Sequence, residues 1–180
     1  MTKCTSANRE FDATAALTPH KRQCENERNM NEEYIFGKLE LEQLDKALTL
    51  IRDVFFEYIA YEFSDEGIEE FIQFIEPSAV KEKLIQDKIR IWTCEDNGKV
   101  IGVLAGYSGY INLLFVNGQY HRKGIARRLL NMMIEQFNLS EITVKSSRYA
   151  VEIYRKLGFI ETDREQTVNG IRFIPMKCTL

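Results

Sequence analysis

The sequence predicts a single domain of the α/β class, with helices and strands mixed along the chain. Three observations support this class. Residues 41–63 place apolar side chains at three- and four-residue steps, the period of an amphipathic helix. Residues 89–116 change to short β-rich runs, two of which are separated by Asn97 and Gly98, a dipeptide typical of tight hairpins. With 180 residues, of which 44% are hydrophobic, the chain is long enough for one substantial core.

The chain divides by composition into a short first part and a longer second part. Residues 1–33 hold ten apolar residues, and Leu17 is the only Leu, Ile or Val among them. Such a segment buries too little apolar surface to offset the entropy lost on ordering. We therefore expect a poorly ordered N-terminal extension over residues 1–33 and a folded domain over residues 34–180.

The first half of the domain predicts one strand and three helices. β-favouring residues mark a strand over 34–39, and the helical period follows from 41 to 63. Ser64 or Asp65 is placed to cap a second helix. Pro77 ends that helix because proline lacks the N–H that a helix interior needs, and residues 78–86 form a third, short helix.

The second half predicts most of the sheet. The run over 110–116 is almost entirely apolar, which indicates a strand near the centre of the sheet. The predicted elements, in order, are strands over 89–94, 99–106 and 110–116, a helix over 122–137, a strand over 141–145, a helix over 147–157 ended by Gly158, and a closing hairpin from Phe159 that turns at Asn169 and Gly170.

Charge is distributed unevenly, and this gives the first indication of a ligand. The 38 residues from Asn97 to Ile134 contain no Asp or Glu and five cations, whereas the other 142 residues hold 27 acids and 19 cations. One positive segment on an acidic protein suits a small phosphate-bearing ligand. A nucleic-acid partner is not expected, since it usually requires a broadly basic domain.

Composition also argues against membrane and metal partners. No apolar run approaches the ~20 residues that cross a bilayer. The four cysteines form no CxxC pair, and the chain has only two histidines. We expect no metal site and read the cysteines as reduced thiols of a cytoplasmic protein.

An anion site is predicted where the strand over 110–116 gives way to the next helix. The first N–H groups of a helix lack intrahelical partners, and its dipole adds about half a positive charge. Gly124 and Ala126 are small enough to let a phosphate or pyrophosphate approach the backbone. Neither GxxxxGK(S/T) nor GxGxxG occurs here, which argues against the nucleotide folds that these motifs mark. An ordinary solvated helix start with surface Arg and Lys is the alternative.

Two segments resemble the GCN5-related N-acetyltransferases, the GNAT family. Residues His121 to Ala126, with the sequence HRKGIA, are similar to the family's acyl-CoA signature Q/R-x-x-G-x-G/A, with histidine at its first position. Residues Ala150 to Phe159 are similar to the family's A-x-x-x-Y-x-x-x-G-F segment, and Ser147 stands where many members carry Asn. The order of elements over residues 34–180 also fits.

The resemblance implies a mixed, mostly antiparallel twisted sheet with helices on both faces and two central strands that splay apart. Acetyl-CoA, as co-substrate, would lie in the cleft between them, with no metal. Strand residues would pair with the pantetheine, and main-chain N–H groups would hold the pyrophosphate. The implied binding residues are Leu114, Phe115, Val116, His121, Arg122, Lys123, Gly124, Ile125, Ala126, Arg127 and Ser147.

The same resemblance implies an acetyl-CoA-dependent N-acetyltransferase. Tyr154 is implied as the acid that protonates the leaving thiolate, because a phenol of pKa about 10 nearly matches an alkyl thiol. The other interpretation of Tyr154 is a core aromatic at helical spacing. A main-chain N–H near 114–116 would stabilise the oxyanion. The base is not identified: Glu57, Glu62, Glu66 and water relays are all candidates.

The acceptor is expected to be a small-molecule or peptide amine, and a homodimer is left open. Residues 62–70 hold five acids and no base. They form either an acidic mouth that attracts a cationic amine or a solvated helix face. The alternative function is a CoA-binding regulatory or sensor domain without turnover. A nucleic-acid module using residues 121–128 is disfavoured by the net charge of −3.

Overall fold

The computed structural model describes residues 34–180, so the N-terminal extension expected over 1–33 lies outside the described residues. One sheet with the strand order β1-β2-β3-β4-β5-β8-β6 runs through the domain, and β7 pairs with β8 beside it. All pairings are antiparallel except that of β4 with β5. The strands are β1 (Ile35–Lys38), β2 (Arg90–Asp96), β3 (Lys99–Tyr107), β4 (Tyr110–Val116), β5 (Glu141–Ser146), β6 (Ile160–Glu161), β7 (Gln166–Val168) and β8 (Ile171–Thr179).

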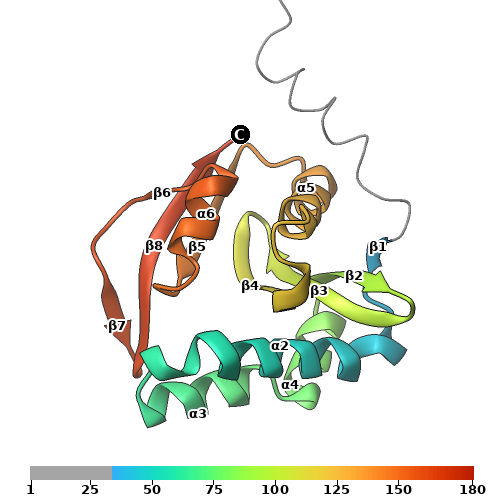
Figure 1. The fold of residues 1–180 in the computed structure, drawn as a ribbon, viewed down its shortest axis with the longest axis horizontal. Helices are drawn as coiled ribbons and strands as arrows, with labels where there is room; N and C mark the ends of the chain where they lie inside the picture. Colours follow the sequence, from blue (N-terminus) through green and yellow to red (C-terminus); the bar gives the residue numbers. More distant parts are fainter. Residues whose placement is uncertain (1–33) are drawn as a thin grey trace, which may run out of the picture. The chain divides into compact units, whose positions relative to one another are not determined.

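Helices cover both faces of this sheet, as Figure 1 shows. The helices are α2 (Leu44–Tyr58), α3 (Asp65–Phe74), α4 (Pro77–Ile85), α5 (Ile125–Phe137) and α6 (Val151–Leu157). The first three lie on one face, and α5 and α6 lie on the other. The mixed fold class predicted from the sequence is therefore confirmed.

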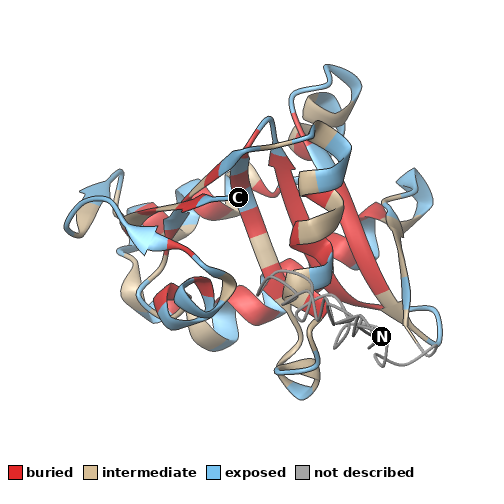
Figure 2. Ribbon diagram, turned by 90° about the horizontal axis from the view of Figure 1, so that it is seen from above, coloured by how far each residue is buried: buried red, intermediate tan, exposed pale blue. Residues whose placement is uncertain are grey.

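The sheet separates two apolar cores. On one side α2 packs Ile51 and Phe55 against Val103 and Leu113 of the central strands. On the other side Leu129 of α5 and its neighbours pack against the opposite face of the same strands. Figure 2 shows this layering, with buried strands between helices whose outer surfaces are exposed. Within residues 34–180, no helix is long and apolar enough to cross a membrane.

The predicted first helix is interrupted, and Pro77 has a different role from the one expected. The helical period over 41–63 corresponds to α2 with short 3-10 turns at Leu41–Gln43 and Ala60–Glu62. Helix α3 ends at Phe74, and Pro77 is the first residue of α4. Proline is well tolerated there, because the first helical N–H needs no acceptor and its fixed φ suits a helix.

The two later helices start downstream of their predicted first residues. We predicted helices over 122–137 and 147–157, but α5 starts at Ile125 and α6 at Val151. Arg122 and Gly124 have φ angles of 61° and 77°. These left-handed conformations cannot be part of a right-handed helix. The prediction treated this loop as the first helical turn.

The central strands separate as the family resemblance implied. Strands β4 and β5 pair only at Tyr110 with Thr143 and at Ile111 with Val144. Beyond these positions the β5-facing edge of residues 112–116 has no partner strand among the described residues. Figure 1 shows the two strands diverging between α5 and α6. The splay leaves main-chain polar groups available at the middle of the sheet.

Candidate functional site

A cavity of about 290 Å³ opens where β4 and β5 separate. Its walls come from α2 and α3 on one face, from β4, β5 and β8 of the sheet, and from α6 on the other face. The cavity therefore passes through the sheet at the splay. Six phenylalanines contribute to its lining, so its interior is mainly apolar with a few polar groups. This composition is typical of a small-molecule site.

Tyr154 reaches this cavity from α6. Its side chain is only 5% exposed, and its ring packs edge-on against Phe159 with the ring centroids 5.2 Å apart. The hydroxyl donates to no acceptor within residues 34–180, although the residue lines the cavity. Burial, with a smaller contribution from Tyr110, raises the pKa of the Tyr154 phenol well above its usual value of 10.0. The phenol therefore keeps its proton and offers an O–H to the cavity.

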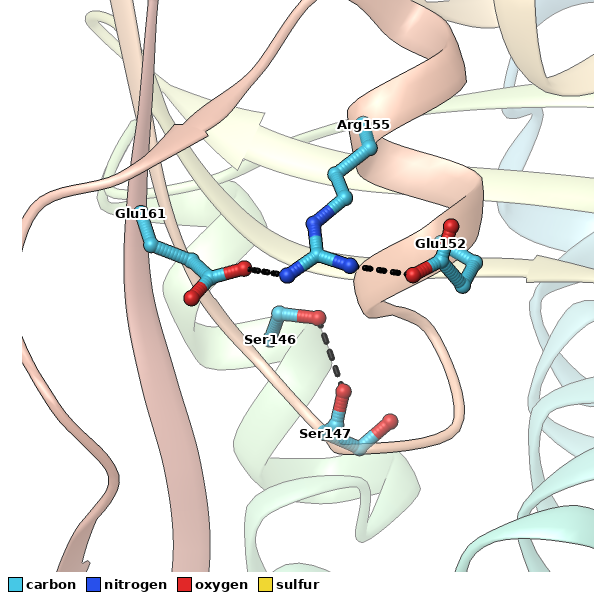
Figure 3. A network of polar contacts seen from close by, with 5 residues as sticks. All are labelled: Ser146, Ser147, Glu152, Arg155 and Glu161. Carbon is cyan, nitrogen blue, oxygen red and sulfur yellow. Dashed lines mark hydrogen bonds and ion pairs between the residues drawn. The ribbon is translucent and has the colours of Figure 1, made fainter.

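Polar contacts tie α6 and the turn before it to their surroundings. Arg155 bridges Glu152 on the same helix and Glu161 on β6, as Figure 3 shows. In the turn before the helix, the Ser146 hydroxyl donates to the Ser147 carbonyl over 2.8 Å. These ties hold the helix that carries Tyr154, although exposed ion pairs contribute little stability each.

The loop after β4 presents main-chain donors. A 3-10 turn at Gly118–Tyr120 leads into residues 121–124, and α5 starts directly after them. The N–H groups of Arg122 and of residues 124–127 have no acceptor among the described residues. Left-handed backbone at Arg122 and Gly124 curves this run of donors into a concave loop. Such loops, placed at a positive helix end, favour anions.

His121 stabilises this loop through a hydrogen bond to the end of β4. Its Nε2 lies 2.9 Å from the carbonyl oxygen of Val116. A carbonyl oxygen only accepts hydrogen bonds, so the ring nitrogen is the donor. The imidazole also lies against Tyr58, with the ring centroids 5.9 Å apart. The histidine that departs from the family signature therefore ties the loop back to the end of β4.

Two of the four cations near the loop make defined contacts. Arg127 donates to the carbonyl of Lys156, at the end of α6, over 2.8 Å. Lys123 lies 3.0 Å from the Tyr34 hydroxyl and over the Tyr120 ring. Arg127 therefore connects α5 to α6 across the splay. Arg122 and Arg128 are exposed.

The candidate bases from the sequence do not line the cavity. Glu57, Glu62 and Glu66 are absent from its lining, which contains Glu70 instead. The Glu62 carboxylate accepts 2.9 Å hydrogen bonds from the main-chain N–H groups of Arg148 and Tyr149. Glu62 thus anchors the turn that precedes α6.

Two cations line the cavity together with Glu70. They are Lys145 of β5 and Arg172 of β8. The Nζ of Lys145 lies 4.6 Å from the centroid of the Phe173 ring, a contact typical of a cation on an aromatic face. The charged part of the lining is therefore one carboxylate and two cations. Across the described residues no group of three or more His, Cys, Asp or Glu is arranged to hold a metal ion.

Comparison with known proteins agrees with this geometry. A family profile described as an acetyltransferase (GNAT) domain matches residues 59–180. The chain belongs to the GNAT family. The protein is 34% identical over 106 residues to the uncharacterized N-acetyltransferase YafP of Escherichia coli (strain K12), an alignment that covers 59% of this chain and 67% of that protein.

Solved structures show the same fold. A GCN5-related N-acetyltransferase from Rhodopseudomonas palustris superposes on this chain with a TM-score of 0.68 at 16% identity. The match covers 81% of this chain and 95% of that one. The PaiA N-acetyltransferase from Thermoplasma acidophilum, solved in complex with coenzyme A, gives 0.67 at 17% identity, covering 82% and 99%.

Within this GNAT domain, the predicted site residues fall into two groups. Leu114, Phe115, Ser147 and Tyr154 line the cavity. Residues 121–127 do not line it and form the loop that follows β4. Val116 lies between the two groups, at the end of β4, where His121 binds its carbonyl. The structure therefore brings the predicted residues to the open end of the splay.

Sequence reasoning named Glu70 only as one of five acids in the run over 62–70, and it missed Lys145 and Arg172 as lining residues of the GNAT cavity. A signal for Lys145 existed in the predicted strand over 141–145. Ile142 and Val144 pack into the α5 core, and successive side chains in a strand alternate between faces. Lys145 thus had to face the α2 and α3 side. The same alternation along β8 places Arg172 on the face of Ile174 and Met176, opposite to the face of Lys145 and Phe173.

Proposed function

We propose that this GNAT protein transfers an acetyl group from acetyl-CoA to the amine of a small-molecule or peptide acceptor. One observation carries the proposal: the cavity at the splay joins the edge of β4 to the hydroxyl of Tyr154, and within residues 34–180 neither has a hydrogen-bond partner there. The concave loop of N–H donors lies at the end of the same strand. These are the features that a thioester donor with a pyrophosphate group requires.

The residues present fit coenzyme A. The main-chain donors of residues 122–127 would hold the pyrophosphate, since several of them have no acceptor among the described residues. The unpaired edge of residues 114–116 would hydrogen-bond the pantetheine, with Ser147 on the facing side. When bound, acetyl-CoA supplies the acetyl thioester and a thiolate leaving group. The coenzyme A complex of PaiA supports this assignment.

Tyr154 supplies the proton-bearing group of the proposed site. Because burial raises its pKa, the phenol is neutral across the physiological range and donates from its Oη. A donor with a pKa above that of a thiol stabilises a developing thiolate chiefly by hydrogen bonding. The ring packing against Phe159 restricts the direction in which the hydroxyl points.

Glu70 is the proposed contact for the acceptor's ammonium group. It is the one carboxylate in the cavity lining among residues 34–180. An ammonium bound there must lose a proton before it attacks, so Glu70 also gives that proton a first acceptor. The free thiols of Cys94 and Cys178 are consistent with action in the cytoplasm.

A thiol-release assay tests the proposal. Purified full-length protein is incubated with acetyl-CoA and pooled amines, and free coenzyme A is followed over time. We expect release that depends on both protein and amine. Binding of coenzyme A by calorimetry without release across a broad amine panel would instead support a sensor domain that lacks turnover.

A further inference from the structure

The tip of the β7–β8 hairpin packs against the first turn of α3, as Figure 1 shows. The two strands are joined by Asn169 and Gly170, whose φ angles of 47° and 73° are the left-handed pair that a two-residue hairpin turn requires. At this tip the Gly170 carbonyl accepts a 3.2 Å hydrogen bond from the N–H of Ser64, the residue that caps α3. Gly67 lies beside the same carbonyl. We call the contact between Ser64, Gly67 and Gly170 the glycine junction.

The glycine junction has no room for a further side chain. A Cβ atom on Gly67 would lie 2.4 Å from the Gly170 carbonyl oxygen, and one on Gly170 would lie 2.0 Å from the Ser64 hydroxyl, whereas ordinary van der Waals contact begins at 3.4 Å. Gly67 is the third residue of α3, a position where glycine weakens a helix relative to alanine. The close approach of the two backbones is what requires glycine on both sides.

The glycine junction lies in the wall of the cavity. Helix α3 contributes Glu70 and Phe71 to the lining, one turn after the junction, and the hairpin contributes Asn169 and Ile171, the neighbours of its junction glycine. Phe71 also stacks on Phe55 of α2 with the ring centroids 3.9 Å apart, which anchors α3 to the core. The tip of the hairpin is exposed, and the junction holds it against α3. The junction therefore sets the spacing between these two parts of the wall.

The cavity that this wall bounds is small. Its volume of about 290 Å³ lies at the lower end of the range of roughly 300–1,000 Å³ that is usual for small-molecule sites. Under the proposed function the thioester end of acetyl-CoA takes up part of this space, because Tyr154 and residues of the β4 edge line the same cavity. The space that remains is mainly apolar and suits a compact amine.

We infer that the glycine junction limits the length of the acceptor, so that the enzyme acetylates a compact primary amine with a short apolar body. The inference rests on the proposed function and deepens it, since it selects small molecules over peptides among the acceptors. A longer amine fits only if the hairpin tip moves away from α3. A methyl group on Gly67 would force that movement, because the main-chain atoms that it meets must retreat by about 1 Å to reach ordinary contact.

Two sets of acceptors test the limit. Primary n-alkylamines from propylamine to decylamine differ only in length, and leucinamide and leucyl-triglycinamide present the same amine without and with a continuing chain. Affinity for the coenzyme A-loaded full-length protein is measured by calorimetry, and kcat/KM by thiol release. Affinity should rise about fourfold for each methylene that enters the cavity and then stop rising within the series. Leucinamide should bind about tenfold or more tightly than the peptide.

Matched alanine variants assign the limit to the glycine junction. Gly67→Ala and Gly170→Ala should each move the limit to longer alkylamines and raise deuterium uptake over residues 166–173, which reports the position of the tip without any ligand. Gly37→Ala is the control for the first variant and Gly98→Ala for the second. Neither control glycine has a neighbour within 4 Å, and Gly98 has a φ of 75°, close to that of Gly170.

The inference fails if affinity rises through the whole alkylamine series, if no alkylamine binds, if leucinamide and its peptide bind equally, or if neither junction variant moves the limit. A length limit in calorimetry that the junction variants move, without thiol release from any acceptor, supports this inference and counts against the proposed function alone.

Discussion

Replacing Tyr154 with phenylalanine isolates the chemistry of one hydroxyl. The ring is 5% exposed and packs against Phe159, and phenylalanine preserves that contact. The hydroxyl lines the cavity and has no partner among the described residues, so its removal leaves no buried acceptor unsatisfied. We therefore expect the free energy of unfolding to change by less than about 1 kcal/mol.

The expected loss of rate follows from the proposed contact. A hydrogen bond to a charged group contributes about 1.5–3 kcal/mol, and each 1.36 kcal/mol is tenfold in rate, so Tyr154→Phe should lower kcat about 13- to 160-fold. Because the main-chain donors of residues 122–127 are untouched, the Kd for coenzyme A should stay within about twofold.

The measurement combines three readouts on the same preparation. Initial rates of thiol release give kcat, calorimetry gives the Kd for coenzyme A, and thermal denaturation reports stability. Tyr149→Phe is the control, since Tyr149 stacks on Tyr58 at 4.9 Å and does not line the cavity. Unchanged turnover in Tyr154→Phe would refute the donor role. A rate loss matched by a large drop in Tm would indicate a structural role instead.

Three further predictions concern the loop, the anchor of α6 and a buried thiol. Gly124→Glu should abolish coenzyme A binding by calorimetry, because it places a carboxylate and a side chain at φ 77° in the loop of main-chain donors. Gly98→Glu is the control and should leave binding intact, because Gly98, at φ 75° in the β2–β3 hairpin, has open space around it. Glu62→Ala removes two charge-assisted hydrogen bonds, so it should lower the free energy of unfolding by about 2 kcal/mol, measured by urea titration. A loss of kcat without a loss of stability would instead identify Glu62 as the base. Burial raises the pKa of the Cys94 thiol from 9.0 to about 12, so its stabilising contribution is complete below pH 9 and is lost as the pH rises toward 12. Urea titrations from pH 8 to 11 should show this decline, and a Cys94→Ala variant with an equally steep decline would contradict it.

Elements with a clear period were predictable from the sequence, and loops with unusual backbone were not. The apolar run of β4 gave its central place correctly, because a central strand packs apolar side chains on both faces, here Leu113 and Phe115 in one core and Ile111 and Leu114 in the other. The start of α5 was misplaced by three residues, since nothing in the composition reveals that Arg122 adopts a left-handed conformation. The helical period of the sequence also runs through the 3-10 turns at Leu41–Gln43 and Ala60–Glu62, so it did not predict that α2 covers only Leu44–Tyr58.

Two parts of the candidate site were marked by motifs in the sequence. Two family motifs located the loop of residues 121–126 and the helix of Tyr154, and the structure brings both to one end of the splay. The acceptor side was not predictable in the same way. Glu70 lies in an acidic run that offers five equivalent carboxylates, and only the packing of α3 against the strands selects one of them.

The two paired positions between β4 and β5 divide the sheet into halves that share very few backbone bonds. Strands β1 to β4 form one half and the remaining strands the other, and the side chains of Glu62 and Arg127 are among the contacts that cross the gap. Amide protons on the open edge of residues 112–116 should therefore exchange with solvent faster than those of β3. A bound coenzyme would act as the missing strand between the halves, slow that exchange and raise the Tm, so occupancy can be read from deuterium uptake alone.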